Sequence, residues 1–326
     1  YNQRYDDVDG ANASESLYGG NLSEEIYRYA NVVTSMFHDE EFDVIHAHDW
    51  VTHPAAKQLK EATGKPLVTH VHITEYDKSG GQGEDEFIKQ IEREGMDAAD
   101  RVVAVSNRVK NHVTEAYGQP ADKVDVVHNA PLPMDAGEKA KTFFHDLDQT
   151  IVLFAGRVTL QKGPEYFVDA AKEALQHDDD LIFVVAGDGD MLGDVMEQVA
   201  HHGISDHFLF TGFYTRDEAN ALFSMADISV MSSVSEPFGI VPYEAQTMKT
   251  PTIISEQSGI SEVLNHTFTV DFWDTRRMAE YILSLANYEK MNETMASNGH
   301  NEVTNRTWHE PANQCKHIYQ DLIEQW

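Results

Sequence analysis

Cysteine is almost absent from this sequence, which has one thiol, Cys315, in 326 residues. A single cysteine cannot form a disulfide within the chain, and disulfides are typical of oxidising compartments, so we predict a cytoplasmic protein. Long apolar runs are absent as well. The longest, at residues 151–156 and 181–187, are far shorter than the roughly 20 residues that a membrane-spanning helix requires. The sequence therefore predicts a protein that does not span a membrane.

Positive charge is scarce: 24 Lys and Arg residues stand against 55 Asp and Glu, a formal net charge of -31 spread along the chain. Nucleic acid is not expected as a partner, because its phosphates would be repelled. Repulsion of this size opposes compact folding at low ionic strength, but about 1 M salt screens charges beyond roughly 3 Å. The composition favours a halophilic protein in a salt-rich cytoplasm. The alternative is an ordinary acidic protein from a mesophile.

Apolar material is plentiful, at 41% of the residues, and it lies in strand-like segments that alternate with helix-like ones. The chain is about twice as long as an ordinary domain of roughly 150 residues, which predicts two domains. Strands are expected at residues 42–48, 66–72, 101–105 and 124–127, and then at 151–155, 181–186, 208–211, 228–231, 252–254 and 267–270.

Strands that alternate with helices form parallel sheets covered on both faces. We therefore predict an α/β protein with one domain at residues 1–130 and a second at 151–308. Residues 131–150 contain prolines without a buried period and are expected to be the linker between domains. A C-terminal helix is expected at 309–326.

Two cations flanked by glycines follow the first strand of the second domain, in the segment GRVTLQKG at residues 156–163. The segment precedes a helix, so Arg157 and Lys162 are expected at the carboxyl edge of a parallel sheet, where α/β proteins bind ligands. Arginine can donate to two phosphate oxygens and lysine adds a compact charge, a combination suited to a diphosphate. The alternative interpretation is an incidental pair of solvated cations.

Two carboxylates follow a later strand of the same domain, in the segment EPFGIVPYE at residues 236–244. A helix beginning near Gly239 would turn its free amide groups toward the same crevice, with Glu236 in the preceding loop and Glu244 about one turn inside. Carboxylates repel phosphate but accept hydrogen bonds from sugar hydroxyls. The motif thus predicts a sugar site. The alternative is a glutamate at a helix start together with a solvated one.

The two motifs, in this order along the chain, resemble those of the family 4 retaining glycosyltransferases, relatives of glycogen synthase and sucrose synthase. The resemblance extends to IHAHDW at residues 45–50, RVVAVS at 101–106, His128 with Asn129, and SGISE at 258–262, so it covers nearly the whole chain. It implies a GT-B fold, with two Rossmann-like domains facing each other across a cleft. The first domain would hold the acceptor and the second the nucleotide sugar.

The resemblance also implies roles for individual residues. Arg157 and Lys162 would hold the diphosphate of the donor, Glu244 would accept hydrogen bonds from ribose hydroxyls, and Glu236 would contact the sugar. The backbone amides expected close to the donor sugar and phosphate are those around Phe238, Gly239 and Ile240. The implied reaction transfers a hexose such as glucose from a UDP- or ADP-linked sugar to a hydroxyl of a saccharide or other acceptor. It retains the anomeric configuration and uses no metal or other cofactor.

Four histidines stand in two pairs, His46 with His48 and His70 with His72, each at positions i and i+2 of an expected strand. Side chains two apart share one face, so four imidazoles at neighbouring strand ends could form a metal site. No cysteine-rich ligand set or HExxH helix accompanies them, and we therefore predict no metal. The resemblance selects His72 as the cleft histidine that lines the donor sugar, and it leaves the other three as structural histidines.

The first domain of the family begins with a strand and a glycine-rich loop that reaches the donor phosphates, whereas this chain opens at Tyr1 without them. We therefore expect that an amino-terminal segment is missing. Two alternative functions remain. A non-catalytic nucleotide-sugar-binding protein or an inactive fragment would keep Arg157, Lys162 and Glu244 without turnover. A metal-dependent hydrolase would instead use the paired histidines.

Overall fold

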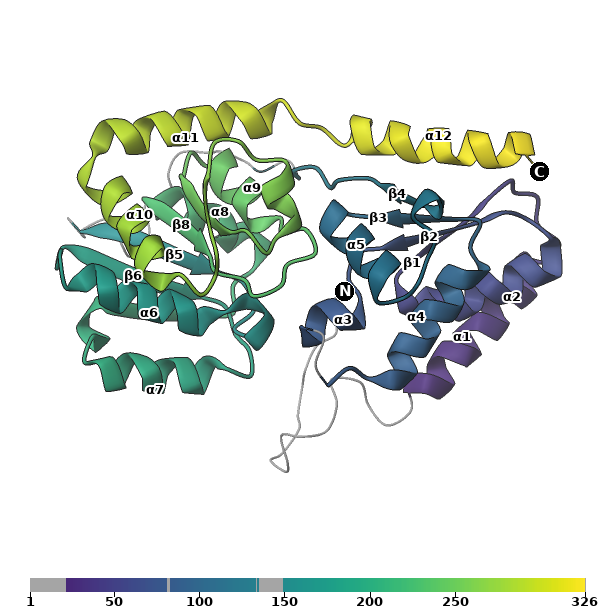
Figure 1. Cartoon of the computed structure of the whole chain (residues 1–326), viewed down its shortest axis with the longest axis horizontal. Helices are drawn as coiled ribbons and strands as arrows, with labels where there is room; N and C mark the ends of the chain where they lie inside the picture. Colours follow the sequence, from purple (N-terminus) through teal and green to yellow (C-terminus); the bar gives the residue numbers. More distant parts are fainter. Residues whose placement is uncertain (1–21, 81–82, 133, 135–148, 326) are drawn as a thin grey trace.

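Two parallel β-sheets form the centres of the two halves of the computed structural model, which describes residues 22–80, 83–132, 134 and 149–325 (Figure 1). The first sheet has the strand order β1-β2-β3-β4, with β1 (Ile45–His48), β2 (Leu67–Val71), β3 (Arg101–Ala104) and β4 (Val124–Val126). The second has the order β10-β9-β8-β5-β6-β7, with β5 (Thr150–Ala155), β6 (Leu181–Ala186), β7 (Phe208–Gly212), β8 (Ile228–Met231), β9 (Thr252–Ser255) and β10 (Phe268–Val270). The predicted α/β fold with two parallel sheets is confirmed.

Helices connect the successive strands. Those of the first half are α1 (Leu22–Phe37), α2 (His53–Thr63), α3 (Glu75–Ser79), α4 (Glu86–Ala98) and α5 (Asn107–Glu115). Those of the second half are α6 (Pro164–Leu175), α7 (Leu192–His202), α8 (Arg216–Met225), α9 (Val241–Thr247) and α10 (Thr275–Asn287), followed by α11 (Glu289–Thr304) and α12 (His309–Gln325). Within the described ranges, no helix combines the length and the apolar character needed to cross a membrane.

The strand order of the second sheet determines where its loops meet. The chain builds β5, β6 and β7 outward in one direction, then returns to place β8 on the other side of β5 and continues through β9 to β10. Ligands of open α/β sheets bind where the order reverses, at the carboxyl ends of the two strands that flank this point. These strands are β5 and β8, and each is followed by one of the two motifs.

The C-terminal helix α12 leaves the second half and lies over the first (Figure 1). Its Ile318 and Leu322 pack against Val68, Val103 and Val127 of the first half, in a small buried cluster. The last helix therefore packs against the first half of the molecule, although it follows the second sheet in the sequence.

The two halves also meet in the middle of the molecule. One buried cluster contains Val105 and Val109 from the first half together with Phe238 and Ile260 from the second. Most of the predicted linker, residues 135–148, lies outside the described residues. The apolar contact between the halves is thus formed by the loops and helices that follow the strands.

Candidate active site

The loop that follows β5 carries the two predicted phosphate ligands. Gly156 follows the strand with a φ of 144°, Lys162 is the last residue of a 3-10 turn, and Gly163, at a φ of 60°, precedes α6. A Cβ atom on Gly163 would lie 2.4 Å from the carbonyl oxygen of Ser232, whose hydroxyl donates to the Gly163 carbonyl at 2.8 Å. The loop is therefore held against the segment after β8, at the point where the strand order reverses.

Lys162 and Glu236 form an ion pair across this junction. Glu236 is 7% exposed, its N–H donates to the Gln257 carbonyl at 2.9 Å, and the Ser233 hydroxyl donates to its carboxylate at 3.4 Å. The residues predicted to hold phosphate and sugar thus touch each other. A phosphate bound here would compete with Glu236 for the Lys162 ammonium, while the carboxylate would be released toward neighbouring hydroxyls.

The other predicted donor contacts lie around this pair. Arg157 is exposed at the start of the loop after β5. Gly239 has a φ of 94°, and a Cβ atom there would lie 2.9 Å from Cγ of Glu236, so the close approach of the carboxylate requires glycine. Phe238 is buried in the core shared by the two halves, whereas Ile240 is exposed. Phe238 can therefore offer only its backbone to a ligand.

Helix α9 begins at Val241, two residues after Gly239, close to the predicted start. The left-handed backbone at Gly239 cannot continue a right-handed helix, so the helix starts two residues later. Glu244, in its first turn, is half-buried, and burial raises the pKa of its carboxyl to about 7 although Arg216 counteracts the shift. The predicted ribose ligand therefore changes its charge near neutral pH.

Residues of the first half contact the loops after β8 and β9 of the second half. The Ser106 hydroxyl caps α5 and also donates to the Pro237 carbonyl at 2.6 Å. Glu262 accepts from the Arg108 N–H at 2.9 Å and contacts His128 Nε2 at 3.0 Å. Burial opposes the ionisation of Glu262, but these hydrogen bonds lower its pKa overall. The motif segments that contain Ser106, His128 and Glu262 thus converge although they lie far apart in the sequence.

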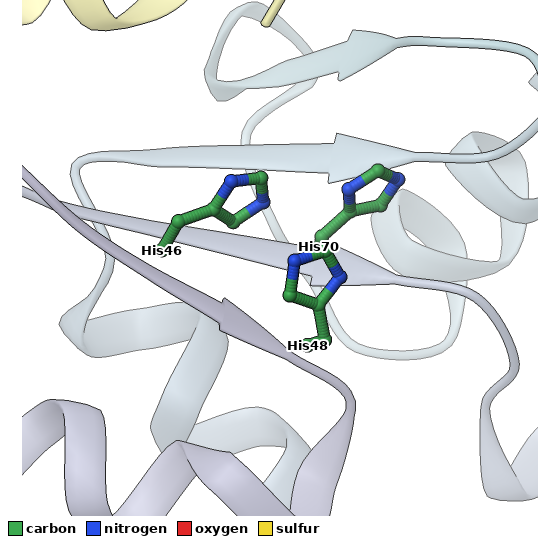
Figure 2. Close-up of side chains that lie close together, drawn as sticks. All are labelled: His46, His48 and His70. Atoms are coloured by element: carbon green, nitrogen blue, oxygen red, sulfur yellow. The ribbon is translucent and has the colours of Figure 1, made fainter. Parts of the chain in front are cut away.

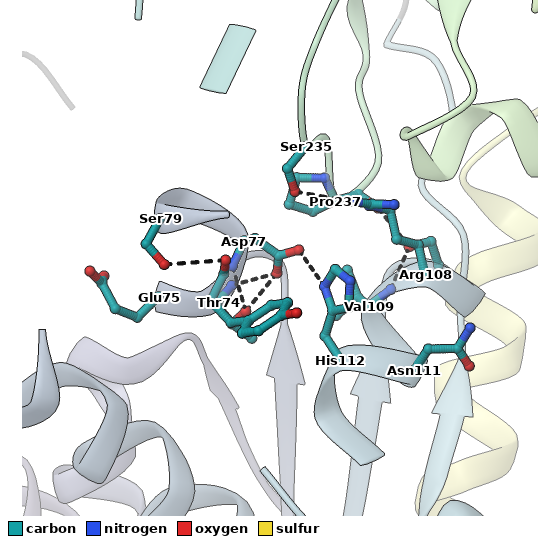
Figure 3. Close-up of polar contacts among 12 residues, drawn as sticks. Thr74, Glu75, Asp77, Ser79, Arg108, Val109, Asn111, His112, Ser235 and Pro237 are labelled. Carbon is teal, nitrogen blue, oxygen red and sulfur yellow. Dashed lines mark hydrogen bonds and ion pairs between the residues drawn. The ribbon is translucent and has the colours of Figure 1, made fainter. Parts of the chain in front are cut away.

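Arg108 is a third cation at this junction, and the sequence does not predict its role. Its Nη2 donates to the Ser235 hydroxyl at 3.3 Å across the two halves, and its Nε is buried without a hydrogen-bond partner among the described residues (Figure 3). Burial lowers the pKa of the guanidinium, while Asp77, Glu236 and Glu262 counteract the shift. An arginine in the first turn of a helix usually suggests a solvated side chain. The acceptor found for its Nη2 among the described residues, Ser235, belongs to the second half.

Asp77 holds a histidine beside Arg108. Its carboxylate is fully buried and accepts from the N–H and the hydroxyl of Thr74, at 3.0 and 2.7 Å, and from His112 Nδ1 at 2.7 Å (Figure 3). The carboxylate orients the imidazole ring. Asp77 lies on α3, a helix of five residues that the sequence does not predict because it is too short to show a period.

His72 lies just beyond the end of β2. Its N–H donates to Oδ1 of Asp49 at 2.8 Å, and its Nε2 lies 2.9 Å from His48 Nδ1. Asp49 has a φ of 57°, a strained conformation for a residue with a side chain, and such strain gathers at functional sites. The contacts found for the His72 ring within the described ranges are with histidines of the first half. Its role beside the donor sugar therefore stays a prediction.

Family models match both halves of the chain. Residues 13–130 match the model described as glycosyltransferase family 4, and residues 135–302, more than half of the chain, match the model described as glycosyl transferases group 1. The chain belongs to the group 1 glycosyl transferases. The match includes both loops that form the ion pair, and the family 4 match includes Ser106 and His128.

This group 1 glycosyl transferase is similar to several curated proteins. It is 34% identical over 239 residues to an uncharacterized glycosyltransferase of Methanocaldococcus jannaschii, covering 70% of this chain and 61% of that protein. It is 27% identical to the alpha-D-kanosaminyltransferase of Streptomyces kanamyceticus, covering 74% of this chain and 66% of the relative. The glycogen synthase of Mycobacterium tuberculosis is 28% identical, with 68% and 54% covered. The chain thus spans less than two thirds of the length of these relatives.

Solved structures share the fold of this glycosyl transferase. A sucrose-phosphate synthase from Thermosynechococcus elongatus superposes with a TM-score of 0.79 at 21% identity, covering 97% of this chain and 82% of that one. HepE of Anabaena, in complex with UDP and glucose, superposes with a TM-score of 0.75 at 19% identity, covering 90% and 81%. The predicted GT-B fold is confirmed.

Proposed function

We propose that this protein is a retaining glycosyltransferase that moves a hexose such as glucose from a UDP- or ADP-linked sugar to a hydroxyl of a saccharide or other acceptor. The observation that carries the proposal is the contact between Lys162 and Glu236 at the point where the strand order of the second sheet reverses. A cation suited to phosphate and a carboxylate suited to sugar hydroxyls therefore lie close enough to bind one nucleotide sugar together. Membership of the group 1 glycosyl transferases supports this assignment.

In the proposed reaction, the bond between the anomeric carbon and the donor phosphate oxygen breaks, and a bond to the acceptor oxygen forms on the same face. The acceptor proton passes to the leaving phosphate oxygen. Arg157 and Lys162 would stabilise the charge that develops on the diphosphate, an effect of about 3 kcal/mol for a well-placed donor. No protein carboxylate attacks the sugar, in contrast to retaining glycosidases, and no metal takes part in this step.

The first half would supply the acceptor side of the site. Arg108 reaches Ser235 from α5 and has a buried Nε donor, while Asp77 orients His112 nearby. Donors of this kind suit an acceptor rich in hydroxyl groups or one that carries a negative charge. Glu262 accepts from the backbone of α5 and joins the two halves, so it would keep the acceptor side in register with the donor side.

Incubation with a panel of UDP-, ADP- and GDP-linked sugars, with and without saccharide acceptors, tests the function. Mass spectrometry would detect the released nucleoside diphosphate and the extended acceptor, and NMR would assign the anomeric configuration. Release that depends on acceptor and gives the donor configuration supports the proposal. Binding without turnover would favour the nucleotide-sugar-binding alternative, and an inverted product would rule out the retaining mechanism.

We also propose that the protein works in a salt-rich cytoplasm, on the basis of its net charge of -31. Screening of this charge should raise the melting temperature as potassium chloride increases from about 0.1 M to above 1 M, where the Debye length falls from roughly 10 Å to 3 Å. Differential scanning fluorimetry at fixed pH measures the effect. A melting temperature that stays flat or falls over this range would contradict the halophilic interpretation.

A further inference from the structure

Four imidazole rings lie together on one face of the first sheet. β1 and β2 are parallel neighbours with His48 in register with His70, so the alternating residues His46, His48, His70 and His72 share a face. Figure 2 shows three of them side by side. The ring centroids of His46 and His48 are 4.4 Å apart, those of His48 and His70 are 5.1 Å apart, and those of His46 and His70 are 5.4 Å apart.

Three ring nitrogens of this cluster have no hydrogen-bond partner among the described residues. His70 is 7% exposed, and neither of its nitrogens has a hydrogen-bond partner among the described residues. Nε2 of His46 is likewise buried without a partner in the described part of the chain. Buried polar atoms are nearly always satisfied, because an unpaired one costs free energy. Two adjacent rings in this state point to a ligand that accepts nitrogen lone pairs.

The sequence alone predicts no metal here, but the arrangement of the rings leads us to propose that His46, His48 and His70 bind a divalent transition-metal ion, with Zn²⁺ as the ion that suits the site best. Each residue can offer one ring nitrogen, and these three atoms lie within 4.8 Å of one another. Zn–N bonds are about 2.0–2.1 Å long, which places the nitrogens of a tetrahedral site roughly 3.4 Å apart. Small ring rotations would therefore bring the three nitrogens to bonding distance of one ion and leave the fourth position open to solvent. Imidazole ligands favour zinc, copper and nickel over magnesium and calcium.

The cluster is shielded on one side and open on the other. His70 is buried and His46 is half-buried, whereas His48 is exposed. The exposed ring of His48 leaves the cluster open to solvent, through which an ion can enter.

Two contacts extend from the cluster to other parts of the protein. Nδ1 of His46 contacts the hydroxyl of Tyr319 on α12. If this nitrogen carries the proton, Nε2 is left as the ligand atom. A hydrogen bond from the other ring nitrogen commonly orients a metal-bound histidine. His48 contacts His72, the predicted cleft histidine. A bound ion would thus hold α12 to the first sheet and fix the ring of His72, a role separate from the chemistry proposed for the donor site.

Metal analysis of the untagged full chain tests the proposal. The chain is dialysed against Zn²⁺ in high salt with excess Mg²⁺, which occupies the many surface carboxylates. We expect one zinc per chain for the wild type and for His177→Gln, a control at an exposed histidine outside the cluster. His46→Gln and His48→Gln should each weaken zinc binding at least ten-fold. Both leave the buried His70 in place, and circular dichroism would show which variants fold.

Cobalt substitution gives an independent readout. Co²⁺ in a tetrahedral site with three imidazoles absorbs strongly in the visible range, whereas Co²⁺ on surface carboxylates absorbs weakly. The strong bands should appear in the wild type and in His177→Gln and vanish in either folded cluster variant. The proposal is overturned if the wild type retains no zinc, or if a folded cluster variant retains zinc as the wild type does. Neither result would bear on the test of glycosyl transfer.

Discussion

Lys162→Ala should bind a nucleoside diphosphate about ten-fold to one-hundred-fold more weakly than the wild type, because a charged hydrogen bond to phosphate is worth roughly 1.5–3 kcal/mol. Glu236→Gln should bind the same nucleotide at least as tightly, since it frees the Lys162 ammonium from its ion pair. The same variant should bind the nucleotide sugar more weakly, because an amide replaces the carboxylate that accepts from sugar hydroxyls. The two changes therefore separate the phosphate site from the sugar site.

Calorimetry with UDP and ADP, and then with their glucose derivatives, measures both effects. The titrations belong above the pKa of Glu244, about 7, so that the predicted ribose ligand is ionised in every variant. High salt keeps the acidic chain folded. Lys290→Ala is the matched control, because Lys290 is an exposed lysine on α11 and its loss should leave the affinity unchanged. Equal binding by the wild type and Lys162→Ala would falsify the assignment of the loop after β5.

Gly187→Ala should lower the free energy of unfolding of the second half by about 2–4 kcal/mol, a combined cost of backbone strain and overpacking. Gly187 has a φ of 144°, which residues with side chains rarely adopt. A Cβ atom there would also lie 1.8 Å from the carbonyl oxygen of Gly156. This carbonyl belongs to the start of the loop that carries Lys162, so relief of the clash would displace the loop. Nucleotide affinity should fall together with stability.

Gly193→Ala is the control for this effect. Gly193 lies in the first turn of α7, and nothing lies within 4 Å of the position that a Cβ atom would take. Alanine in a helix is favoured over glycine by about 0.5–1 kcal/mol, so the control should be as stable as the wild type or more so. Urea unfolding followed by circular dichroism compares the three proteins. A Gly187→Ala curve that coincides with the wild type would show that the strand ends tolerate a side chain.

Local patterns were sufficient to predict most of the secondary structure. The expected strand at residues 228–231 is β8 with the same bounds, and Ser106 caps α5. Both follow from the chemistry of neighbouring residues, namely a short apolar run and a hydroxyl placed before a helix. Helix α9 begins within two residues of the predicted start, after the left-handed backbone of Gly239. The helix α3 was not predicted, because five residues are too few to show a helical hydrophobic period.

The sequence predicted which residues belong to the site, but not which of them contact one another. Lys162 and Glu236 were expected to hold different parts of one ligand, yet the structure makes them partners. Arg108 was not predicted, because its acceptor Ser235 belongs to the other half. The histidines of β1 and β2 were predicted to share faces within each pair, while their mutual contact depends on the parallel register of His48 with His70.

The sequence by itself determined the alternation of strands and helices, the two motifs with their cations and carboxylates, and the acidic surface. These properties reside in composition and short-range periodicity, which need no knowledge of distant contacts. Only the tertiary structure decided that the loops after β5 and β8 meet, that Glu262 joins the two halves, and that α12 returns to the first sheet. Each of these depends on strand order and on the packing of one half against the other. Residues far apart in the chain come together there, and no local pattern encodes their distance.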